Sequence, residues 1–217
     1  MKKNKHKALN QSNHYFYNRI GKRSADIIGS ITLIIILFPF IILFSIILVL
    51  FSGRPLFFRQ IRSGLNDCPF TIWKFRTMKT ELIEYSDHQY HWTKEVPKDF
   101  LFTKPEHLQV TRIGKIYRKF SVDEIPQLWN VLKGDMSFVG PRPEIVEITI
   151  HYSSEQKKRL LVKPGITGYA QVYGRSTITY GEKIERDLYY VQNCSFILDF
   201  KIIIRSIGIV ITGKGAY

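Results

Sequence analysis

Two adjacent carboxylates, Asp123 and Glu124, lie in the segment SVDEIPQLWNVLKGDMSFVGPRPE, which runs from Ser121 to Glu144. Paired carboxylates can act as a nucleophile, hold a divalent cation, or do both in phosphoryl transfer. They can also form the first turn of a helix, because Ser121 and Glu124 have the spacing of a capping box. A helix N-terminus would in addition keep Asp123 ionised. The residues alone leave the structural and the chemical interpretation open.

Many of the residues around this acidic pair are cations of the kinds that bind phosphate. Arginine pairs with phosphate through two hydrogen bonds, and lysine acts as a point charge. Two acids among several bases are typical of phosphoryl transfer, in which the bases neutralise a diphosphate. A solvated surface charge is the alternative for each single cation. The candidates are Arg112, Lys115, Arg118, Lys119, Lys133 and Arg142, joined by Lys74 and Arg76 if the segment that carries them packs nearby.

The sequence Gly140-Pro141-Arg142-Pro143 predicts a stiff loop. Each proline fixes its own φ angle and restricts the residue before it, so Arg142 is presented at a low cost in entropy. A rigid loop with an exposed arginine and no ligand is the alternative. The glycines in Pro164-Gly165-Ile166-Thr167-Gly168 either let the backbone approach a ligand closely or form turns.

The charge balance points to acidic partners. The chain has 217 residues and a formal net charge of +14, a length that suggests one globular domain with an added segment. Nucleic acid, anionic lipid and phosphorylated small molecules are the usual partners of such a protein. No charged residue occurs from Ile27 to Gly53, which favours the last two. We therefore expect no nucleic-acid partner, and we expect Cys68 and Cys194 to be free thiols without a zinc site.

The apolar run from Ile27 to Phe51 is long enough to cross a bilayer as one helix. Pro39 at its middle predicts a break, and both flanks are basic, which keeps both ends on the cytoplasmic side. Each arm of about 12 residues extends about 18 Å, less than a hydrocarbon core of about 30 Å. The run therefore predicts a re-entrant helix-break-helix, with a kinked single span as the alternative.

The remaining sequence predicts a mostly helical α+β fold with a small β-hairpin at residues 55–78. The C-terminal segment Phe196 to Thr212 is apolar but contains three charges, which is typical of an amphipathic helix at a membrane interface. A buried core helix is the alternative there. Other expected elements are helices at Ser121–Leu132, Ser153–Leu161 and Thr179–Val191, a short strand at Tyr169–Val172, and a variable loop with short helical pieces at Glu81–Val110.

Three regions follow from these patterns. They are a basic polar segment at residues 1–21, a membrane-embedded helix at 22–53 broken at Pro39, and a cytosolic catalytic domain at 54–217.

The chain contains six motifs in this order: KRSADIIGS, PLFFRQIRSGLN, FTIWKFRTM, TRIGKIYRKFSVDEIPQLWNVLKGDMSFVGPRPE, VKPGITGYAQVYGR and DLYYVQNCSFILDFKII. Together they resemble the bacterial sugar transferases, which are monotopic polyprenyl-phosphate phosphoglycosyl transferases. The resemblance covers about Lys22 to Ile211, and the long block that ends in Gly-Pro-Arg-Pro is specific to that family.

The resemblance implies transfer of a sugar-1-phosphate from a UDP-sugar to undecaprenyl phosphate, with release of UMP. This reaction begins the assembly of capsule, exopolysaccharide, O-antigen or glycoprotein glycans at the cytoplasmic face of the bacterial inner membrane. By similarity, Asp123 is the nucleophile that forms a phosphosugar aspartyl intermediate, and Glu124, with Asp123, holds Mg²⁺. The residues matched to phosphate or nucleotide binding are Lys74, Arg76, Arg118, Pro141, Arg142, Pro143 and Arg175. Expected partners are the two substrates, anionic lipid and a second copy in a homodimer.

Two other functions fit the same residues. One is a membrane-anchored, Mg²⁺-dependent hydrolase of nucleotide-diphosphate sugars, in which water replaces the lipid acceptor. The other is a non-enzymatic basic module that binds a membrane surface, for which Asp123 would be dispensable.

Overall fold

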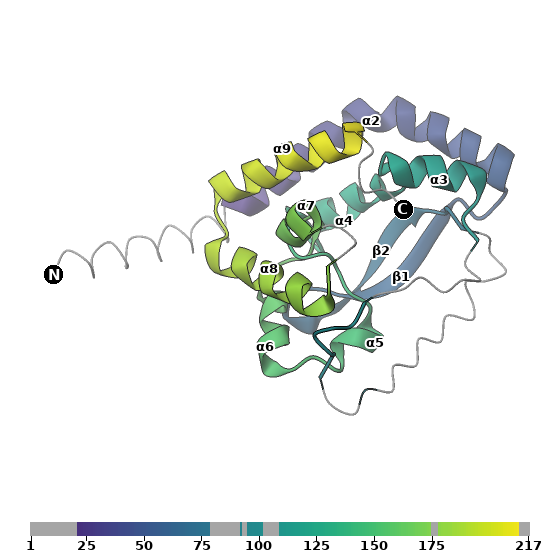
Figure 1. The fold of residues 1–217 in the computed structure, drawn as a ribbon. Coiled ribbons are helices and arrows are strands. Elements are labelled where there is room, and N and C mark those ends of the chain that lie inside the picture. The colour runs from purple at the N-terminus through teal and green to yellow at the C-terminus, as the bar shows by residue number, and fades with distance from the viewer. Residues whose placement is uncertain (1–20, 79–91, 93–94, 102–108, 175–177, 213–217) are drawn as a thin grey trace.

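The computed structural model describes residues 21–78, 92, 95–101, 109–174 and 178–212. Within these ranges the protein is a mostly helical α+β fold, as the sequence predicted, and it contains two small sheets. A long helix, α2, arches across one side of the molecule, with α9 and α3 on the same side and α5 and α6 at the opposite end (Figure 1). Residues 1–20, Arg175 and most of the predicted loop at 81–110 lie outside the described residues.

Helix α2 runs from Lys22 to Ser52 and contains Pro39 without interruption. The predicted break is therefore a bend within one helix, which is visible in the ribbon (Figure 1). Among the described residues, α2 is the one helix long and apolar enough to cross a membrane. Its large apolar side chains are mostly exposed, for example Ile35 at 68% and Leu50 at 73%. An exposed apolar helix of this length needs an apolar environment.

Polar contacts attach the first turns of α2 to the rest of the protein. The Lys22 ammonium forms an ion pair with Asp199 and donates to the Tyr190 hydroxyl at 3.0 Å. The Asp26 carboxylate accepts hydrogen bonds from the Ser137 hydroxyl and the Phe138 N–H, each at 3.0 Å. Because Asp26 is buried, these two donors replace the water that it would otherwise bind.

Two arginines satisfy the last carbonyls of helices, which have no partner inside the helix itself. Arg23 donates to the carbonyls of Val131 and Leu132 at 2.6 and 2.7 Å, at the end of α4 (Gln127–Lys133). Arg76 donates to the carbonyls of Ser52 and Gly53 at the end of α2, the latter at 2.8 Å. Both ends of α2 are thus bound to the domain that follows it.

The predicted hairpin is confirmed. Strands β1 (Phe57–Ser63) and β2 (Pro69–Phe75) pair antiparallel. Asn66 and Asp67 in the connection have φ angles of 52° and 62°. These residue types tolerate the left-handed region better than most, which explains the turn at this point.

A second, parallel sheet joins β3 (Ser137–Val139) to β4 (Gly165–Thr167). The predicted strand at Tyr169–Val172 is wrong, because those residues begin helix α7 (Tyr169–Gly174). The strand lies earlier because Gly165 allows close backbone contact. A Cβ atom at Gly165 would lie 2.1 Å from the Gly140 nitrogen. The glycines of this segment therefore bring two backbones together within the fold.

The remaining helices are short except for the last two. Serine or threonine caps with a glutamine or glutamate three residues on begin α6 and α8, as the capping-box pattern predicts. The predicted helix at Ser121–Leu132 is divided into two parts by a turn around Pro126. The elements are α3 (Arg112–Lys119), η4 (Val122–Glu124), α4, α5 (Val146–Thr149), α6 (Ser154–Lys157), η5 (Lys158–Leu161), α7, α8 (Tyr180–Asn193) and α9 (Phe196–Thr212).

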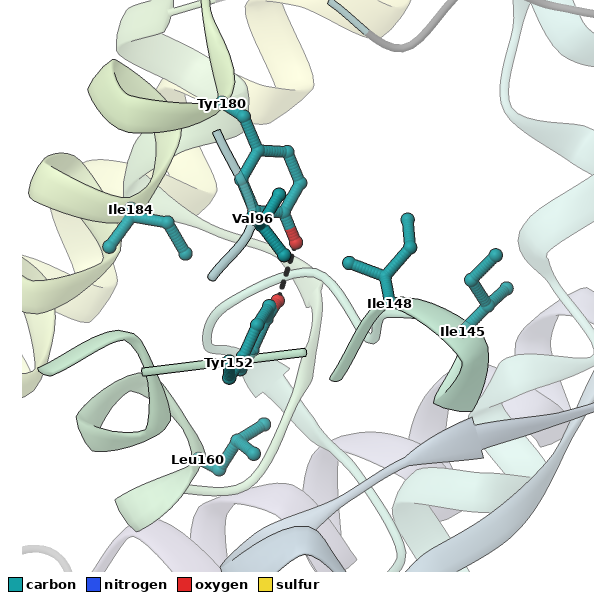
Figure 2. Close-up of a cluster of buried hydrophobic side chains, with 7 residues drawn as sticks. All are labelled: Val96, Ile145, Ile148, Tyr152, Leu160, Tyr180 and Ile184. Carbon is teal, nitrogen blue, oxygen red and sulfur yellow. Dashed lines mark hydrogen bonds between the residues drawn. The ribbon is translucent and has the colours of Figure 1, made fainter. Parts of the chain in front are cut away.

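A buried cluster beneath α8 joins α5, η5 and the segment around Val96 (Figure 2). The hydroxyls of Tyr152 and Tyr180 meet in this cluster at 2.6 Å, so each buried phenol has a polar partner. A separate cluster packs Leu48 of α2 against Phe75 and Tyr117. The second half of α2 therefore shares a core with the hairpin and α3.

Helix α9 is amphipathic. Asp199 and Ile202 are buried, whereas six large apolar side chains are half-exposed or more. At about 100° per residue these six fall within an arc of about 100°, so they form one continuous apolar face. The pattern favours the predicted interfacial helix over a buried core helix. The six residues are Phe196, Ile197, Phe200, Ile204, Ile207 and Ile211.

Candidate functional site

The acidic pair lies on the single turn η4 between α3 and α4. Ser121 has a φ angle of 54° and its side chain caps nothing, so the predicted capping box is wrong. Pro126 is the residue that precedes the first turn of α4. It fits there because its missing N–H group would have no helical partner at that position.

Glu124 is held between two cations from distant parts of the chain. Its Oε1 atom lies 2.9 Å from the Lys74 ammonium and 2.8 Å from the Arg142 guanidinium. Burial raises the pKa of Glu124, but the charges and hydrogen bonds of Arg142 and Lys74 outweigh burial and lower the pKa to about 2. Glu124 is therefore ionised at neutral pH, and it orients both cations toward the same point.

Asp123 is buried next to this group, with 8% of its surface exposed. Burial and the charge of Glu124 raise its pKa, while Lys74, Arg142 and Arg118 counteract that rise. Among the described residues, none forms a hydrogen bond or ion pair with its carboxylate. Three nearby cations, rather than a helix dipole at the first turn of α4, are what favour the ionised form.

Arg118 reaches the site from the last turn of α3. Its Nε atom donates to the Thr77 hydroxyl at 2.9 Å, which fixes the guanidinium beside the end of β2. Burial lowers its pKa, whereas the charges of Asp123 and Glu124 raise it. The site thus combines three predicted cations, Lys74, Arg118 and Arg142, with both predicted carboxylates.

The loop at Gly140-Pro141-Arg142-Pro143 is rigid, as predicted, because its last three carbonyls are all bound. The carbonyls of Pro141 and Arg142 accept from Gly165 N at 3.0 Å and Arg159 Nη2 at 2.9 Å. The Pro143 carbonyl accepts from Arg62 at 3.3 Å. Proline has no N–H group to satisfy, so both prolines are buried without an unpaired donor. The Arg142 side chain remains 44% exposed and faces Glu124.

A buried network beneath the loop was not predicted. Arg159, which is 1% exposed, donates to the Asp187 carboxylate at 2.6 Å and to the Tyr152 hydroxyl at 2.6 Å. Glu144 lies 3.9 Å from Arg159 and pairs with Lys183. Burial raises the pKa of Glu144, but these cations lower it to about 2. The partners are far apart in sequence, so no local spacing marks them.

Asn130 was also missed, although it connects α4 to β2. Its Oδ1 atom accepts from the Trp73 N–H at 3.1 Å, and its Nδ2 atom donates to the Thr71 carbonyl at 2.7 Å. A fully buried amide with both ends bound fixes the distance between the two elements. Since Lys74 follows Trp73 on β2, Asn130 also sets the position of Lys74 relative to the acidic pair.

Two other predicted cations, Arg76 and Lys133, are bound away from the acidic pair. Arg76 is buried, and its guanidinium is bound to carbonyls at the end of α2, which gives it a structural role in this conformation. Lys133 pairs with Asp135 at 3.2 Å. Arg175 lies outside the described residues.

An apolar groove with a volume of about 270 Å³ borders the charged site. It lies between α2, the hairpin and the turn that follows Glu124. Every residue that lines it is apolar. These residues are Ile41, Phe57, Trp73, Ile125, Pro126 and Trp129.

The carboxylates fit the donor set that Mg²⁺ requires. Among residues 21–78, 92, 95–101, 109–174 and 178–212, no group of three or more His, Cys, Asp or Glu side chains gathers into a metal site. Mg²⁺, however, is usually held by one or two carboxylates, with substrate phosphates and water completing its shell. Asp123 and Glu124 supply two adjacent carboxylates of that kind.

Comparison with known proteins identifies the family. The family described as bacterial sugar transferase matches residues 17–213. The chain belongs to this family. It is 44% identical to the uncharacterized sugar transferase EpsL of Bacillus subtilis, over 81% of this chain and 80% of that protein. The predicted family resemblance is therefore confirmed.

Two further members of the family have names that state a reaction. The chain is 38% identical to a UDP-glucose:undecaprenyl-phosphate glucose-1-phosphate transferase of Klebsiella pneumoniae, over 92% of this chain and 42% of that protein. It is 36% identical to a UDP-N-acetylgalactosamine-undecaprenyl-phosphate N-acetylgalactosaminephosphotransferase of Aeromonas hydrophila, over 90% of this chain and 44% of that protein. The chain thus spans less than half the length of these two relatives.

Proposed function

We propose that this protein transfers a sugar-1-phosphate from a UDP-sugar to undecaprenyl phosphate and releases UMP. The observation that carries the proposal is the grouping of Asp123 and Glu124 with Lys74, Arg118 and Arg142, which come from four separate segments. A site with two acids and three cations suits a diphosphate donor. The names of family members from Klebsiella pneumoniae and Aeromonas hydrophila support the same reaction.

In the first step, a carboxylate oxygen of Asp123 attacks the phosphorus atom that carries the sugar. A new bond joins that oxygen to phosphorus, the bond from phosphorus to the bridging oxygen breaks, and UMP leaves with that oxygen. Arg142, Lys74 and Arg118 stabilise the charge on the phosphate oxygens. Glu124 keeps two of these cations oriented.

In the second step, an oxygen of the lipid phosphate attacks the same phosphorus atom. The bond to Asp123 breaks, which restores the carboxylate and leaves the sugar on a lipid diphosphate. Division into two steps lets one site accept a soluble substrate and a lipid in turn. A product of this kind is a starting point for polysaccharide assembly, and one relative from Sinorhizobium fredii is named an exopolysaccharide production protein.

Mg²⁺ is the cation that we expect in this site. When bound, it would neutralise charge on the donor diphosphate. Asp123 and Glu124 are the residues that would hold it, because they are the carboxylates of the site.

We also propose that α2 enters the cytoplasmic leaflet of the bacterial inner membrane and returns to the same side. A straight helix of its 31 residues would extend about 46 Å. Its first turn pairs with Asp199 and its last turn binds Arg76, and both partners belong to the same domain. Two ends bound to one domain support the re-entrant arrangement over a helix that crosses the bilayer.

Other exposed apolar groups lie on the same side of the molecule. Helices α9 and α3 run on the same side as α2 (Figure 1). Helix α9 carries the apolar face described above, and Ile116 and Phe120, in and after α3, are 53% and 43% exposed. Lys115 and Lys119 are exposed beside them. Apolar side chains flanked by lysines favour contact with an anionic lipid surface.

The reaction is tested with the purified protein, Mg²⁺, a panel of UDP-sugars and undecaprenyl phosphate, by following UMP and lipid-linked sugar. With at least one UDP-sugar, we expect one molecule of lipid-linked sugar to form for each UMP released. Sustained release of UMP without the lipid would instead support a hydrolase. Membrane binding that persists without any reaction would support a non-enzymatic module.

The membrane arrangement is tested by the accessibility of tags in intact cells. One tag is placed at the N-terminus and one after residue 217, and both are probed with a reagent that enters only the periplasm. We expect both to be protected until the inner membrane is permeabilised. A labelled N-terminus with a protected C-terminus would rule out the re-entrant arrangement.

A further inference from the structure

We propose that the apolar groove between α2, the hairpin and residues 125–129 binds the isoprene units of the lipid acceptor nearest to its phosphate. The inference rests on the proposed function and adds a location to it. Its occupant is a hydrocarbon chain attached to a phosphate.

The walls of the groove have the chemistry of a hydrocarbon site. All six side chains that line it are apolar, and the Phe57 and Trp73 rings meet edge to face with centroids 5.9 Å apart. Trp129 is 53% exposed and Phe57 is 38% exposed, so the groove is accessible from outside the domain. A ligand here gains by removing exposed aromatic surface from water.

The groove is continuous along the chain with the charged site. Ile125 and Pro126 directly follow Glu124, and Trp73 directly precedes Lys74. Successive strand residues point to opposite faces, so Trp73 lines the groove while the Lys74 side chain points to the other face of β2, toward Glu124. A ligand with a phosphate at one end and a hydrocarbon at the other matches these two adjacent positions.

The third wall connects the groove to the apolar surface of α2. Ile41 contributes this wall, and its neighbours Phe40 and Ile42 are 50% and 46% exposed. A volume of about 270 Å³ is slightly below the roughly 300–1,000 Å³ of pockets that enclose a whole small molecule. The groove therefore holds one end of a long chain, and the remainder continues along α2 into the bilayer.

The nucleotide of the donor is a poorer match for this groove. A uracil ring has polar edges that need hydrogen-bond partners when they leave water. The six lining side chains offer at most the indole N–H donors of Trp73 and Trp129, and no acceptor for the uracil N–H. The groove thus favours the lipid over the UMP part of the donor.

The kinetic test uses Trp129→Ala, which removes a half-exposed side chain from the wall of the groove. The variant is first checked for an unchanged melting temperature. We expect the burst of UMP from the UDP-sugar alone to match that of the wild type, because the first step needs no lipid. The KM for undecaprenyl phosphate should rise about tenfold. The matched control is Ile150→Ala, which removes an exposed apolar side chain after α5 at the opposite end of the molecule (Figure 1). It should change neither value.

A binding test without turnover separates this inference from the proposed reaction. The full-length protein in micelles is irradiated with a three-isoprene phosphate that carries a diazirine on its first isoprene unit. We expect labelled peptides that contain Ile41, Trp73 or residues 125–129, even with a protein that forms no product.

Three results would contradict the proposal that the groove binds the lipid acceptor. They are labelling confined to other peptides, a lipid KM that Trp129→Ala leaves unchanged, and a raised KM for the UDP-sugar with a weaker burst, which would assign the groove to the nucleotide. Labelling of the groove in a protein that releases no UMP from any UDP-sugar would contradict the proposed reaction and retain the lipid site.

Discussion

The buried guanidinium of Arg159 donates a hydrogen bond of 2.9 Å to the backbone carbonyl of Arg142. Arg159 is held in turn by Asp187, so an internal ion pair supports the loop that carries a residue of the site. The backbone of Arg142 is therefore supported by residues other than Glu124, which binds its guanidinium. Variants of Arg159 and Asp187 therefore change the support of this loop without replacing a residue of the charged site.

Replacement of Arg159 by leucine should destabilise the protein by about 3–5 kcal/mol, because Asp187 is then buried without its partner. The double variant Arg159→Leu/Asp187→Leu should recover much of that loss. Chemical denaturation in micelles measures both. A double variant no more stable than the single variant would show that the ion pair is not the source of the effect.

Glu144 should make stability depend on pH in acid. Its folded pKa of about 2 lies below its ordinary value of 4.5, so its ionised form stabilises the protein above pH 4.5. That contribution, about 3 kcal/mol, is lost as the pH falls from about 4.5 to about 2. Glu144→Gln should lose less stability over this window than the wild type. Glu124 is present in both proteins, so its contribution cancels in the comparison. Parallel curves of stability against pH would contradict the assignment of this pH dependence to Glu144.

The elements that could be predicted from the sequence are those defined by local patterns. The hairpin follows from strand-forming residues on either side of an Asn-Asp turn, and the helix predicted at Thr179–Val191 is α8, whose N-cap is Thr179. Helix α9 has the predicted bounds, Phe196 and Thr212, since its apolar run has clear ends. Asp123 and Glu124 were predicted as site residues through the family resemblance, because their local spacing fitted a helix cap equally well.

Long-range contacts determine what could not be predicted. The strand β4 lies at Gly165–Thr167 because Gly165 packs on Gly140, which is far away in sequence. Arg76 shares a motif with Lys74, yet it lies just beyond β2 and meets the end of α2 instead of the acidic pair. A charge pattern gives the number of cations near a site, but the packing decides which of them face it.

Arg142→Lys tests whether the site needs a guanidinium or only a positive charge. Lysine keeps the charge but loses the paired geometry that suits phosphate. We expect kcat/KM for the UDP-sugar to fall about 10- to 100-fold, which corresponds to the loss of one charge-assisted hydrogen bond. The control is Arg112→Lys on the exposed first turn of α3, which should retain full activity. An unchanged kcat/KM in Arg142→Lys would show that the reaction does not need the guanidinium.

Asn130→Ala should weaken the connection between α4 and β2. It leaves the Trp73 N–H and the Thr71 carbonyl without their partner, at a cost of about 1–3 kcal/mol for each group that stays buried. The melting temperature should fall, and the first step should slow because Lys74 is no longer fixed relative to Glu124. A lower melting temperature with an unchanged first step would limit Asn130 to a role in stability.

The covalent mechanism is tested by the burst of UMP from a UDP-sugar in the absence of lipid. The wild type should release one UMP for each protein chain and gain the mass of one sugar phosphate on Asp123, while Asp123→Asn should do neither. Glu155→Gln, which removes an exposed carboxylate far from the site, should behave as the wild type. Release of UMP only when lipid is present, or a full burst and adduct in Asp123→Asn, would contradict the covalent mechanism.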